Sequence, residues 1–234
     1  MKTHHKNSER LVNKVFQDVF DKYDLMNDLM SLGIHRLWKK NFIHWLNPQK
    51  NTILIDVASG TGDIAKLYLD KVQYKGSVYC VDENKGMLDL NKKKLEKNSN
   101  VKWFCNSAEK LPFKNNYFDY YTISFGIRNV SNINNALKEA YRVLKPGGRF
   151  LCLEFSKVKN EILNKLYKTY SKSIPQLGKF IVGKSGPYEY LINSIEKFYS
   201  QEKFFQQIKK QNFINVSYRN LSGGIVAIHS AWKV

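Results

Sequence analysis

The pattern of apolar and polar positions changes at about Asn51 and divides the chain into two parts. Before it, apolar residues such as Leu11, Val15 and Val19 recur every three to four positions, and this spacing predicts helix over much of 8–46. A second apolar helix is expected over 35–45, after a break at 31–33. After Asn51, short apolar runs alternate with segments of helical spacing.

The apolar runs of the second part are short enough to be strands. They lie at 52–57, 77–81, 101–105, 118–125, 149–155, 213–218 and 224–232. Helices are expected between them at 63–69, 85–96 and 133–144. This alternation predicts an α/β fold with a mostly parallel, Rossmann-like, seven-stranded sheet and helices on both faces. The last two strands are close enough to form an antiparallel hairpin that closes it.

A basic segment separates the predicted strand at 149–155 from the closing hairpin. Residues 157–210 have helical spacing with expected interruptions at Pro175 and 183–187, and they carry eleven Lys against four Glu. We interpret this segment as an insertion over the mouth of the sheet. The chain is therefore expected to be a single domain, 1–234, with a helical lid (1–46), a nucleotide-binding core (51–156), a basic insertion (157–211) and a closing hairpin (212–234).

The charge balance is unusual. The chain has 38 Lys and Arg against 20 Asp and Glu, a net charge of +18. This favours nucleic acid or an anionic membrane surface, although lysines spread along the whole chain also fit a solvated surface. No apolar run approaches the roughly 18 residues that span a bilayer, and 1–10 do not resemble a secretory signal. The three cysteines have no metal-site spacing and are expected to be buried thiols; no metal is indicated.

The turn after the first predicted strand carries the clearest chemistry. Gly60 and Gly62 let the backbone turn sharply and approach a ligand, while the next helix directs its free N–H groups there. Asp82 ends the following strand, where a carboxylate accepts both hydroxyl hydrogens of a ribose. The spacing also fits the dinucleotide pattern, so NAD is an alternative. However, Asp56 and Asp63 flank the loop with negative charge, which would repel a pyrophosphate.

S-adenosylmethionine (SAM) fits that charge pattern better, because it carries an adenosine, a sulfonium and an ammonium but no phosphate. The segment Ser107-Ala108-Glu109, after the third strand, is interpreted as the contact to the adenine edge. Together with Asp56, the glycine loop and Asp82, this segment favours a methyltransferase over an NAD enzyme.

Longer segments resemble the ubiquinone/menaquinone biosynthesis methyltransferases over nearly the whole chain. The segments that carry this resemblance are YDLMNDLMSLGIHRLW at 23–38, SFGIRNV at 124–130, RVLKPGGRF at 142–150, LEFS at 153–156 and GGIVAIH at 223–229. The RVLKPGG element is shared by many small-molecule methyltransferases, whereas the first segment is far more specific. Ser59 stands where the family often has glycine, a departure that should not block cofactor binding.

The resemblance implies the class I methyltransferase fold, SAM as cofactor, and C-methylation of a 2-polyprenyl-6-methoxy-1,4-benzoquinol, of demethylmenaquinol, or of both. It also implies cofactor contacts at Thr61, Asp82, Ser107, Ala108 and Ser124. No metal ligand is implied.

Methylating a quinol ring carbon requires a group that accepts a proton or stabilises the phenolate that develops. Arg128 follows the fourth strand and is expected to face the transferred methyl group, where it would orient a water or stabilise the phenolate; a loop salt bridge is the alternative. His35, Tyr23 and Asn27 lie in the predicted lid. His35 is a candidate base or a structural hydrogen-bond partner.

Two other functions fit part of the sequence. A nucleic-acid methyltransferase would suit the charge, but the stretch Ser124–Ile127 lacks the Pro-Pro-aromatic element of amino-group methylases, and no appended RNA-binding module follows. The other alternative is a non-catalytic, SAM-binding subunit of a quinone-synthesis complex, but the intact loop, Asp82 and Arg128 argue against a loss of activity. The expected partner is therefore a prenylated quinol and not nucleic acid.

Because the substrate is lipid-soluble, peripheral membrane association through the basic insertion is expected. That association implies the cytoplasm at the inner face of the membrane, or a mitochondrial matrix. A homodimer or a quinone-synthesis complex is the expected assembly.

Overall fold

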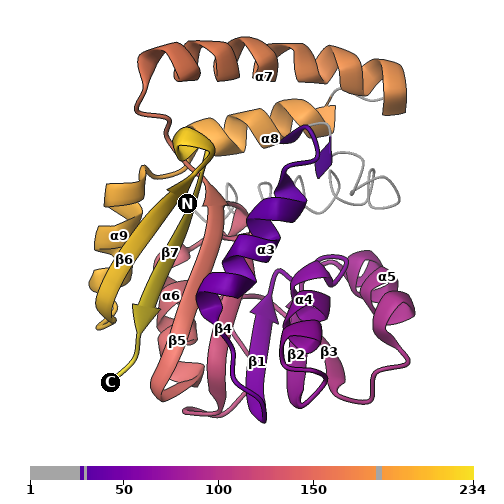
Figure 1. Ribbon diagram of the computed structural model, residues 1–234, viewed down its shortest axis with the longest axis vertical. Helices are drawn as coiled ribbons and strands as arrows, with labels where there is room; N and C mark the ends of the chain where they lie inside the picture. The colour runs from indigo at the N-terminus through magenta and orange to yellow at the C-terminus, as the bar shows by residue number, and fades with distance from the viewer. Residues whose placement is uncertain (1–26, 29–30, 183–185) are drawn as a thin grey trace.

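The sheet has seven strands in the order β3-β2-β1-β4-β5-β7-β6 (Figure 1). The computed structural model describes residues 27–28, 31–182 and 186–234. The strands are β1 Thr52–Val57, β2 Gly76–Asp82, β3 Val101–Cys105, β4 Phe118–Ser124, β5 Leu144–Phe155, β6 Ile214–Leu221 and β7 Val226–Trp232. The first five pair in parallel, whereas β7 pairs antiparallel with both β5 and β6. The predicted fold class is confirmed.

Helices cover both faces of the sheet (Figure 1). They are α3 His35–Leu46, α4 Asp63–Lys71, α5 Lys85–Leu95, α6 Ile133–Val143, α7 Glu161–Val182, α8 Gly186–Lys197 and α9 Gln201–Lys209. Successive strand residues point to opposite faces, so Leu54 belongs to an apolar cluster with residues of α3, α4, α5 and α8, while Ile55 belongs to a second cluster with residues of α6 and α9. The core is therefore two apolar layers, one on each side of the sheet.

Two predicted boundaries are wrong. The strand expected at 149–155 starts at Leu144, because Gly147 donates to the Lys233 carbonyl at 2.8 Å and Lys233 donates back to Gly148 at 3.0 Å. These bonds hold the Pro-Gly-Gly stretch as a bulge within the sheet. Pro175 does not interrupt α7, since the neighbouring Ile174 is fully buried and its packing outweighs one lost backbone hydrogen bond.

The cysteines also differ from expectation. Cys80 and Cys152 are buried, but Cys105 is exposed because β3 is the edge strand of the sheet. The remaining predicted strands and helices match the observed elements to within a few residues, and 52–57 and 101–105 match at both ends.

Within the basic insertion, α7 and α8 lie over the carboxyl ends of the parallel strands, whereas α9 packs beside β6 and β7 (Figure 1). Within the described ranges, no helix is long and apolar enough to cross a membrane. The division of the chain into lid, core, insertion and hairpin stays a prediction, because most of residues 1–30 lies outside the described residues.

Candidate active site

The sheet brings the predicted site residues to one edge. The strand order reverses between β1 and β4, and open α/β sheets bind ligands beyond the carboxyl ends at such a switch point. Asp56 is near the end of β1, Ser124 ends β4 and Asp82 ends β2. A small pocket opens there, lined by Lys39, Asp56, Ala58, Ser59, Gly60, Thr61, Asp63, Ile64, Ser124 and Phe125.

The loop between β1 and α4 needs both of its glycines, for different reasons. Gly60 and Gly62 have φ angles of +51° and +84°, which side chains rarely adopt. A Cβ on Gly62 would lie 2.5 Å from Oδ1 of the buried Asn91, so Gly62 is needed for internal packing. A Cβ on Gly60 would meet nothing within 4 Å, so the Gly60 backbone faces open space where a ligand can approach.

Asp82, at the end of β2, is hydrogen-bonded to this loop. Its carboxylate accepts hydrogen bonds from the backbone N–H of Gly60 and of Asn84, each at 2.9 Å. Burial raises the pKa of Asp82 to about 6, against the lowering effect of these two donors. A carboxylate has about four lone-pair sites, so two acceptor sites are left for a ligand.

The pocket contains two buried polar atoms without a hydrogen-bond partner among the described residues. They are Oδ2 of Asp56 and Oγ of Ser124, while Oδ1 of Asp56 accepts from Thr122 at 2.8 Å. Burial raises the pKa of Asp56 to about 7, and the nearby Asp82 adds to the rise. Buried polar atoms are normally paired, so these two mark a place where a polar ligand completes the structure.

The raised pKa of Asp56 predicts how stability depends on pH. The folded protein keeps a proton that the unfolded chain releases near the ordinary value of 3.8, so this group stabilises the fold at low pH. That contribution should be lost as pH rises from about 4 to about 7. The free energy of unfolding in urea is measured for the unmodified protein and for Asp56→Asn between about pH 4.5 and about pH 8. The unmodified protein should lose stability relative to Asp56→Asn as the pH rises, because the variant has no carboxyl group to ionise at this position. Parallel stability curves for the two proteins would contradict the assignment.

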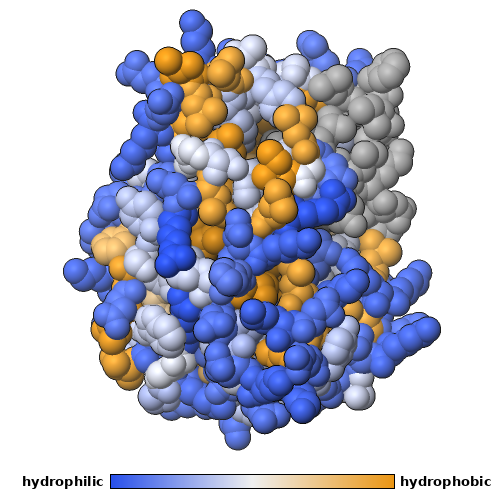
Figure 2. Space-filling view, in the orientation of Figure 1, coloured by the Kyte–Doolittle hydropathy of each residue, from blue (hydrophilic) through white to orange (hydrophobic). Residues whose placement is uncertain are grey.

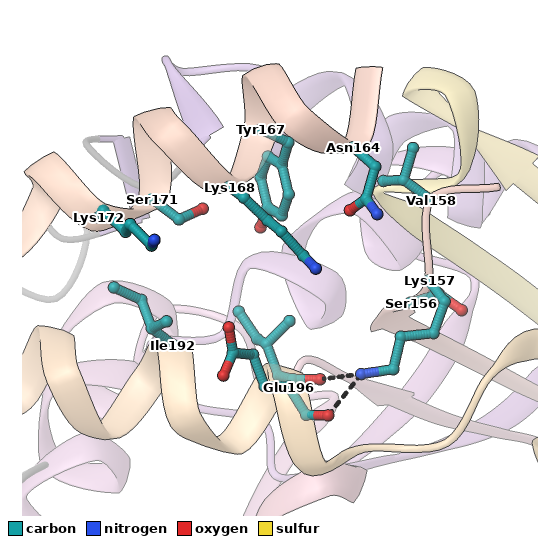
Figure 3. A pocket seen from close by; sticks show the side chains of 11 residues that line it. Ser156, Lys157, Val158, Asn164, Tyr167, Lys168, Ser171, Lys172, Ile192 and Glu196 are labelled. Atoms are coloured by element: carbon teal, nitrogen blue, oxygen red, sulfur yellow. Dashed lines mark hydrogen bonds between the residues drawn. The ribbon is translucent and has the colours of Figure 1, made fainter. Parts of the chain in front are cut away.

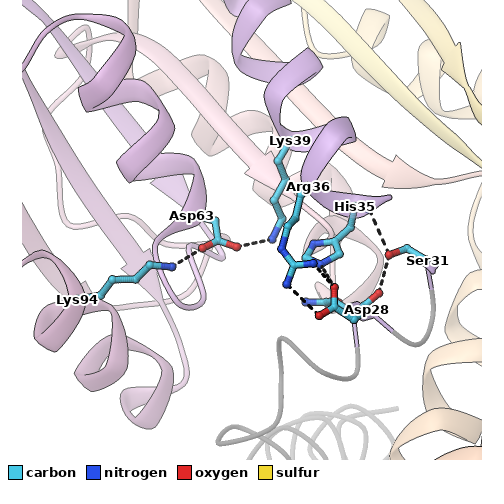
Figure 4. A network of polar contacts seen from close by, with 8 residues as sticks. Asp28, Ser31, His35, Arg36, Lys39, Asp63 and Lys94 are labelled. Carbon is cyan, nitrogen blue, oxygen red and sulfur yellow. Dashed lines mark hydrogen bonds and ion pairs between the residues drawn. The ribbon is translucent and has the colours of Figure 1, made fainter. Parts of the chain in front are cut away.

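A network of charges joins α3 to the pocket (Figure 4). Lys39 is buried, and its Nζ lies 2.8 Å from Oδ2 of Asp63; Lys94 pairs with the other oxygen of Asp63. Burial alone would raise the pKa of Asp63, but the two lysines hold it well below its usual range. Lys39 thus places a positive charge in the wall of the pocket.

His35 lies one turn before Lys39 and is buried. Its Nε2 is 2.9 Å from Oδ1 of Asp28, and Nδ1 has no hydrogen-bond partner among the described residues. Burial, and then the charge of Lys39, lowers the pKa of His35, so the ring is neutral at pH 7. Asn27 accepts a hydrogen bond from Ser31 through its carbonyl at 2.6 Å. Tyr23 lies outside the described residues.

Arg128 lies in the short helix η2 Ile127–Asn129 and is locked in place. Nη1 lies 2.7 Å from Oε1 of Glu154 and donates to the Phe125 carbonyl at 2.6 Å, while Nε donates to Ser194 of α8 at 3.3 Å. The side chains of Arg128 and Glu154 are 3% and 1% exposed. Arg128 therefore forms a salt bridge, which was the alternative to its expected role in catalysis. Its guanidinium also contacts the carbonyl of Phe125, a residue of the pocket wall.

The other predicted residues lie around the same edge. Gly60, Thr61, Asp56 and Ser124 line the pocket, and Gly62 sits beneath it against Asn91. Asp82, Ser107 and Ala108 follow along the ends of β2 and β3 and are not part of the pocket wall.

Sequence reasoning missed Lys39 and Phe125. Lys39 occupies the apolar stripe of α3 between Trp38 and Phe42, and a lysine on such a stripe could have indicated a buried charge. Phe125 has a φ of +56° and packs against Trp38 and Phe155, with ring centroids 6.2 and 5.0 Å away. Nothing in the sequence indicated that strain.

Comparison with known proteins identifies the family. The sequence matches the ubiE/COQ5 methyltransferase family over residues 2–233. The ubiquinone/menaquinone biosynthesis C-methyltransferase UbiE of Rickettsia bellii strain OSU 85-389 is 55% identical over 97% of this chain and 94% of its own length. The UbiE of Rickettsia prowazekii strain Madrid E is 55% identical over 96% of this chain and 93% of its own length.

Solved structures of lower identity share the fold. A SAM-dependent methyltransferase from Thermotoga maritima has a TM-score of 0.67 at 20% identity, covering 94% of this chain and 99% of that one. Phosphoethanolamine N-methyltransferase 2 of Haemonchus contortus has a TM-score of 0.63 at 16% identity, covering 84% of this chain and 52% of that one. At these identities the likeness concerns the fold alone.

Proposed function

The chain belongs to the ubiE/COQ5 methyltransferase family, and from that premise we propose which of its residues carry the reaction. It is a SAM-dependent C-methyltransferase of ubiquinone/menaquinone biosynthesis that methylates a quinol. The substrate proposed here is a 2-polyprenyl-6-methoxy-1,4-benzoquinol, demethylmenaquinol, or both.

The observation that carries the assignment of the cofactor site is the pair of unpartnered atoms on Asp56 and Ser124. When bound, SAM supplies a methyl group made electrophilic by its sulfonium. Asp56 and Ser124 suit its ammonium, and the buried charge of Lys39 suits its carboxylate. The pocket thus offers partners of opposite sign to the two ends of an amino acid.

The adenosine half is assigned to the neighbouring strand ends. Asp82 would accept the two ribose hydroxyl hydrogens with the lone pairs that the loop leaves available. Thr61 and the open face of Gly60 would let the ligand approach the loop, and Ser107 and Ala108 would meet the adenine edge.

Calorimetry tests this cofactor site directly. SAM should bind the purified chain and NAD should not, because Asp56 places a carboxyl group without a neutralising ion pair in the pocket wall, whereas Asp63 is paired with Lys39 and Lys94. Asp56→Asn should weaken SAM binding by about tenfold or more through the loss of a charge-assisted hydrogen bond. Tighter binding of NAD than of SAM would refute the proposal.

The ring of the quinol becomes nucleophilic at carbon as a neighbouring hydroxyl loses its proton. Arg128 stays charged, so we assign it to stabilising the developing phenolate or to orienting a water that takes the proton. Its bonds to Glu154, Phe125 and Ser194 support this, because they fix the guanidinium before substrate arrives. His35 keeps both of its expected roles, because Nε2 is held by Asp28 while Nδ1 has no hydrogen-bond partner among the described residues.

Peripheral membrane attachment is proposed for the outer face of α7. Ile162 and Leu166, four residues apart, are 75% and 64% exposed, with the exposed Lys165 between them. Figure 2 shows apolar side chains at the surface over the beginning of α7, among hydrophilic neighbours. The relatives compared are bacterial, which supports the cytoplasmic face of the membrane as the location. A homodimer or a quinone-synthesis complex stays a prediction.

Vesicle flotation checks the attachment. The protein should float with vesicles rich in phosphatidylglycerol at low salt and release at high salt, since each lysine near an anionic surface contributes about 1 kcal/mol. Exchanging both Ile162 and Leu166 for Ser should weaken binding about tenfold or more. Ile214→Ser is the matched control, because this exposed residue lies on the edge strand β6. If the double variant at Ile162 and Leu166 bound vesicles as well as Ile214→Ser does, α7 would not be the membrane-binding face.

A further inference from the structure

A second, larger cavity lies between α7 and α8. It has a volume of about 530 Å³, within the range of small-molecule pockets. Val158, Ile192 and Ile195 give it apolar walls, and Tyr167 and Ser171 project into it from α7 (Figure 3). The cofactor site described above uses none of these residues.

The cavity contains its own unsatisfied polar atoms. The hydroxyls of Tyr167 and Ser171, one helical turn apart, are buried, and among the described residues neither bonds to any group except the hydroxyl of the other. Burial raises the pKa of Tyr167, although Ser171 and Arg128 act in the other direction, so the phenol keeps its proton at pH 7. Two adjacent hydroxyls beside the apolar side chains of Val158, Ile192 and Ile195 suit a ligand that is mostly ring and carries oxygen substituents.

The charges around the cavity have one dominant sign. Lys157, Lys168 and Lys172 line it against the single acid Glu196. Nζ of Lys157 donates to the carbonyls of Ile195 and Glu196 at 3.0 and 2.6 Å, which holds it at the end of α8, while Lys168 extends toward the middle of the space (Figure 3). A positive surrounding favours a ring oxygen that becomes anionic.

Arg128 connects this cavity with the cofactor pocket. It donates to Phe125 on one side and to Ser194 on the other, and Ser194 precedes Ile195 of the cavity wall. Ser156, also in the wall, follows Glu154 by two residues. Arg128 lines neither space, but its charge acts on the Tyr167 phenol, so a ring in the cavity would lie within electrostatic range of the guanidinium. The residues of α7 that face the cavity lie on the side of the helix opposite Ile162 and Leu166.

From this arrangement we infer that the α7–α8 cavity holds the ring of the quinol, with the hydroxyls of Tyr167 and Ser171 as hydrogen-bond partners of its oxygen substituents. The inference rests on the proposed function. It makes Tyr167 and Ser171 specificity-determining residues for the methyl acceptor, with no part in binding SAM.

Three variants and one control test the inference. Tyr167→Phe and Ser171→Ala each remove one hydroxyl, and Ile192→Trp fills the cavity. Tyr74→Phe is the matched control, because its hydroxyl bonds to Asp70 on the surface, before the start of β2 and thus at the opposite edge of the sheet. The probe is 6-methoxy-2-prenyl-1,4-benzoquinol with one isoprene unit, kept reduced. KM for the quinol, kcat, the Kd for SAM and the Tm are measured for each protein.

Tyr167→Phe and Ser171→Ala should each raise the KM for the quinol about 5- to 10-fold, as expected for one lost hydrogen bond, with kcat changing less. Ile192→Trp should abolish saturation by the quinol. All three should keep the Kd for SAM within about twofold, and Tyr74→Phe should match the unmodified protein.

An unchanged KM in both hydroxyl variants would overturn the inference and leave the proposed function standing. If the unmodified protein binds SAM but does not methylate the quinol, the proposed substrate fails and the inference fails with it.

Discussion

Replacing Asp82 with Ala should lower the affinity for SAM by about 100-fold or more. The carboxylate is expected to accept two ribose hydroxyls, and each hydrogen bond to a charged acceptor is worth about 1.5–3 kcal/mol. The same carboxylate also holds the N–H groups of Gly60 and Asn84, so its loss loosens the loop that meets the ligand. The Kd for SAM is measured by calorimetry.

The ligand-free fold should tolerate this change. Burial already raises the pKa of Asp82 to about 6, which means that the ionised carboxylate is costly for the empty protein. The Tm of Asp82→Ala without ligand should therefore stay near that of the unmodified protein, while the rise in Tm on adding SAM disappears. Glu83→Ala is the matched control, because Glu83 is the adjacent, exposed acid. A normal ligand-induced rise in Asp82→Ala would show that the ribose is bound elsewhere.

Arg128→Ala should abolish most turnover and also destabilise the protein. Removing the guanidinium leaves Glu154 buried and unpaired, and breaking a buried ion pair in this way costs about 3–5 kcal/mol. Loss of a fixed positive group at a developing oxyanion costs about 100-fold in rate. Urea unfolding and steady-state turnover measure the two effects separately.

A double variant separates stability from catalysis. Arg128→Met together with Glu154→Gln removes both charges and keeps one oxygen that can accept from the backbone N–H of residue 128 or of Phe155, which bond to different oxygens of Glu154 in the unmodified protein. It should recover most of the free energy of unfolding but none of the turnover. Recovered turnover would mean that Arg128 only neutralises Glu154, and its assignment to the developing phenolate would be withdrawn.

Local pattern was enough to predict most of the fold. β1 and β3 are short apolar runs bounded by turn residues, and both begin and end where the sequence predicts. The two wrong boundaries, the start of β5 and the expected break of α7 at Pro175, depend on contacts with residues distant in sequence. Backbone hydrogen bonds with Lys233 place the Pro-Gly-Gly stretch within β5. The burial of Ile174 stabilises α7 as a continuous helix across Pro175. Neither contact is visible in a local window.

Local sequence also predicts part of the site, but not its ion pairs. The glycine loop and Asp82 follow from motif and spacing, because parallel strands bring their carboxyl ends to one edge. The pairing of Arg128 with Glu154, 26 residues later, does not follow, nor does the contact of Lys39 with Asp63. Such pairs depend on how α3 and β5 pack, which periodicity does not fix.

The most direct test of the account follows the methyl group itself. Purified protein is incubated with methyl-labelled SAM and a short-tailed demethylated benzoquinol kept reduced, with total RNA in a parallel reaction, and mass spectrometry locates the label. The account predicts label on a ring carbon of the quinol, none on RNA, and none with Asp82→Ala. Label on RNA alone, or on a quinol oxygen and no ring carbon, would contradict it.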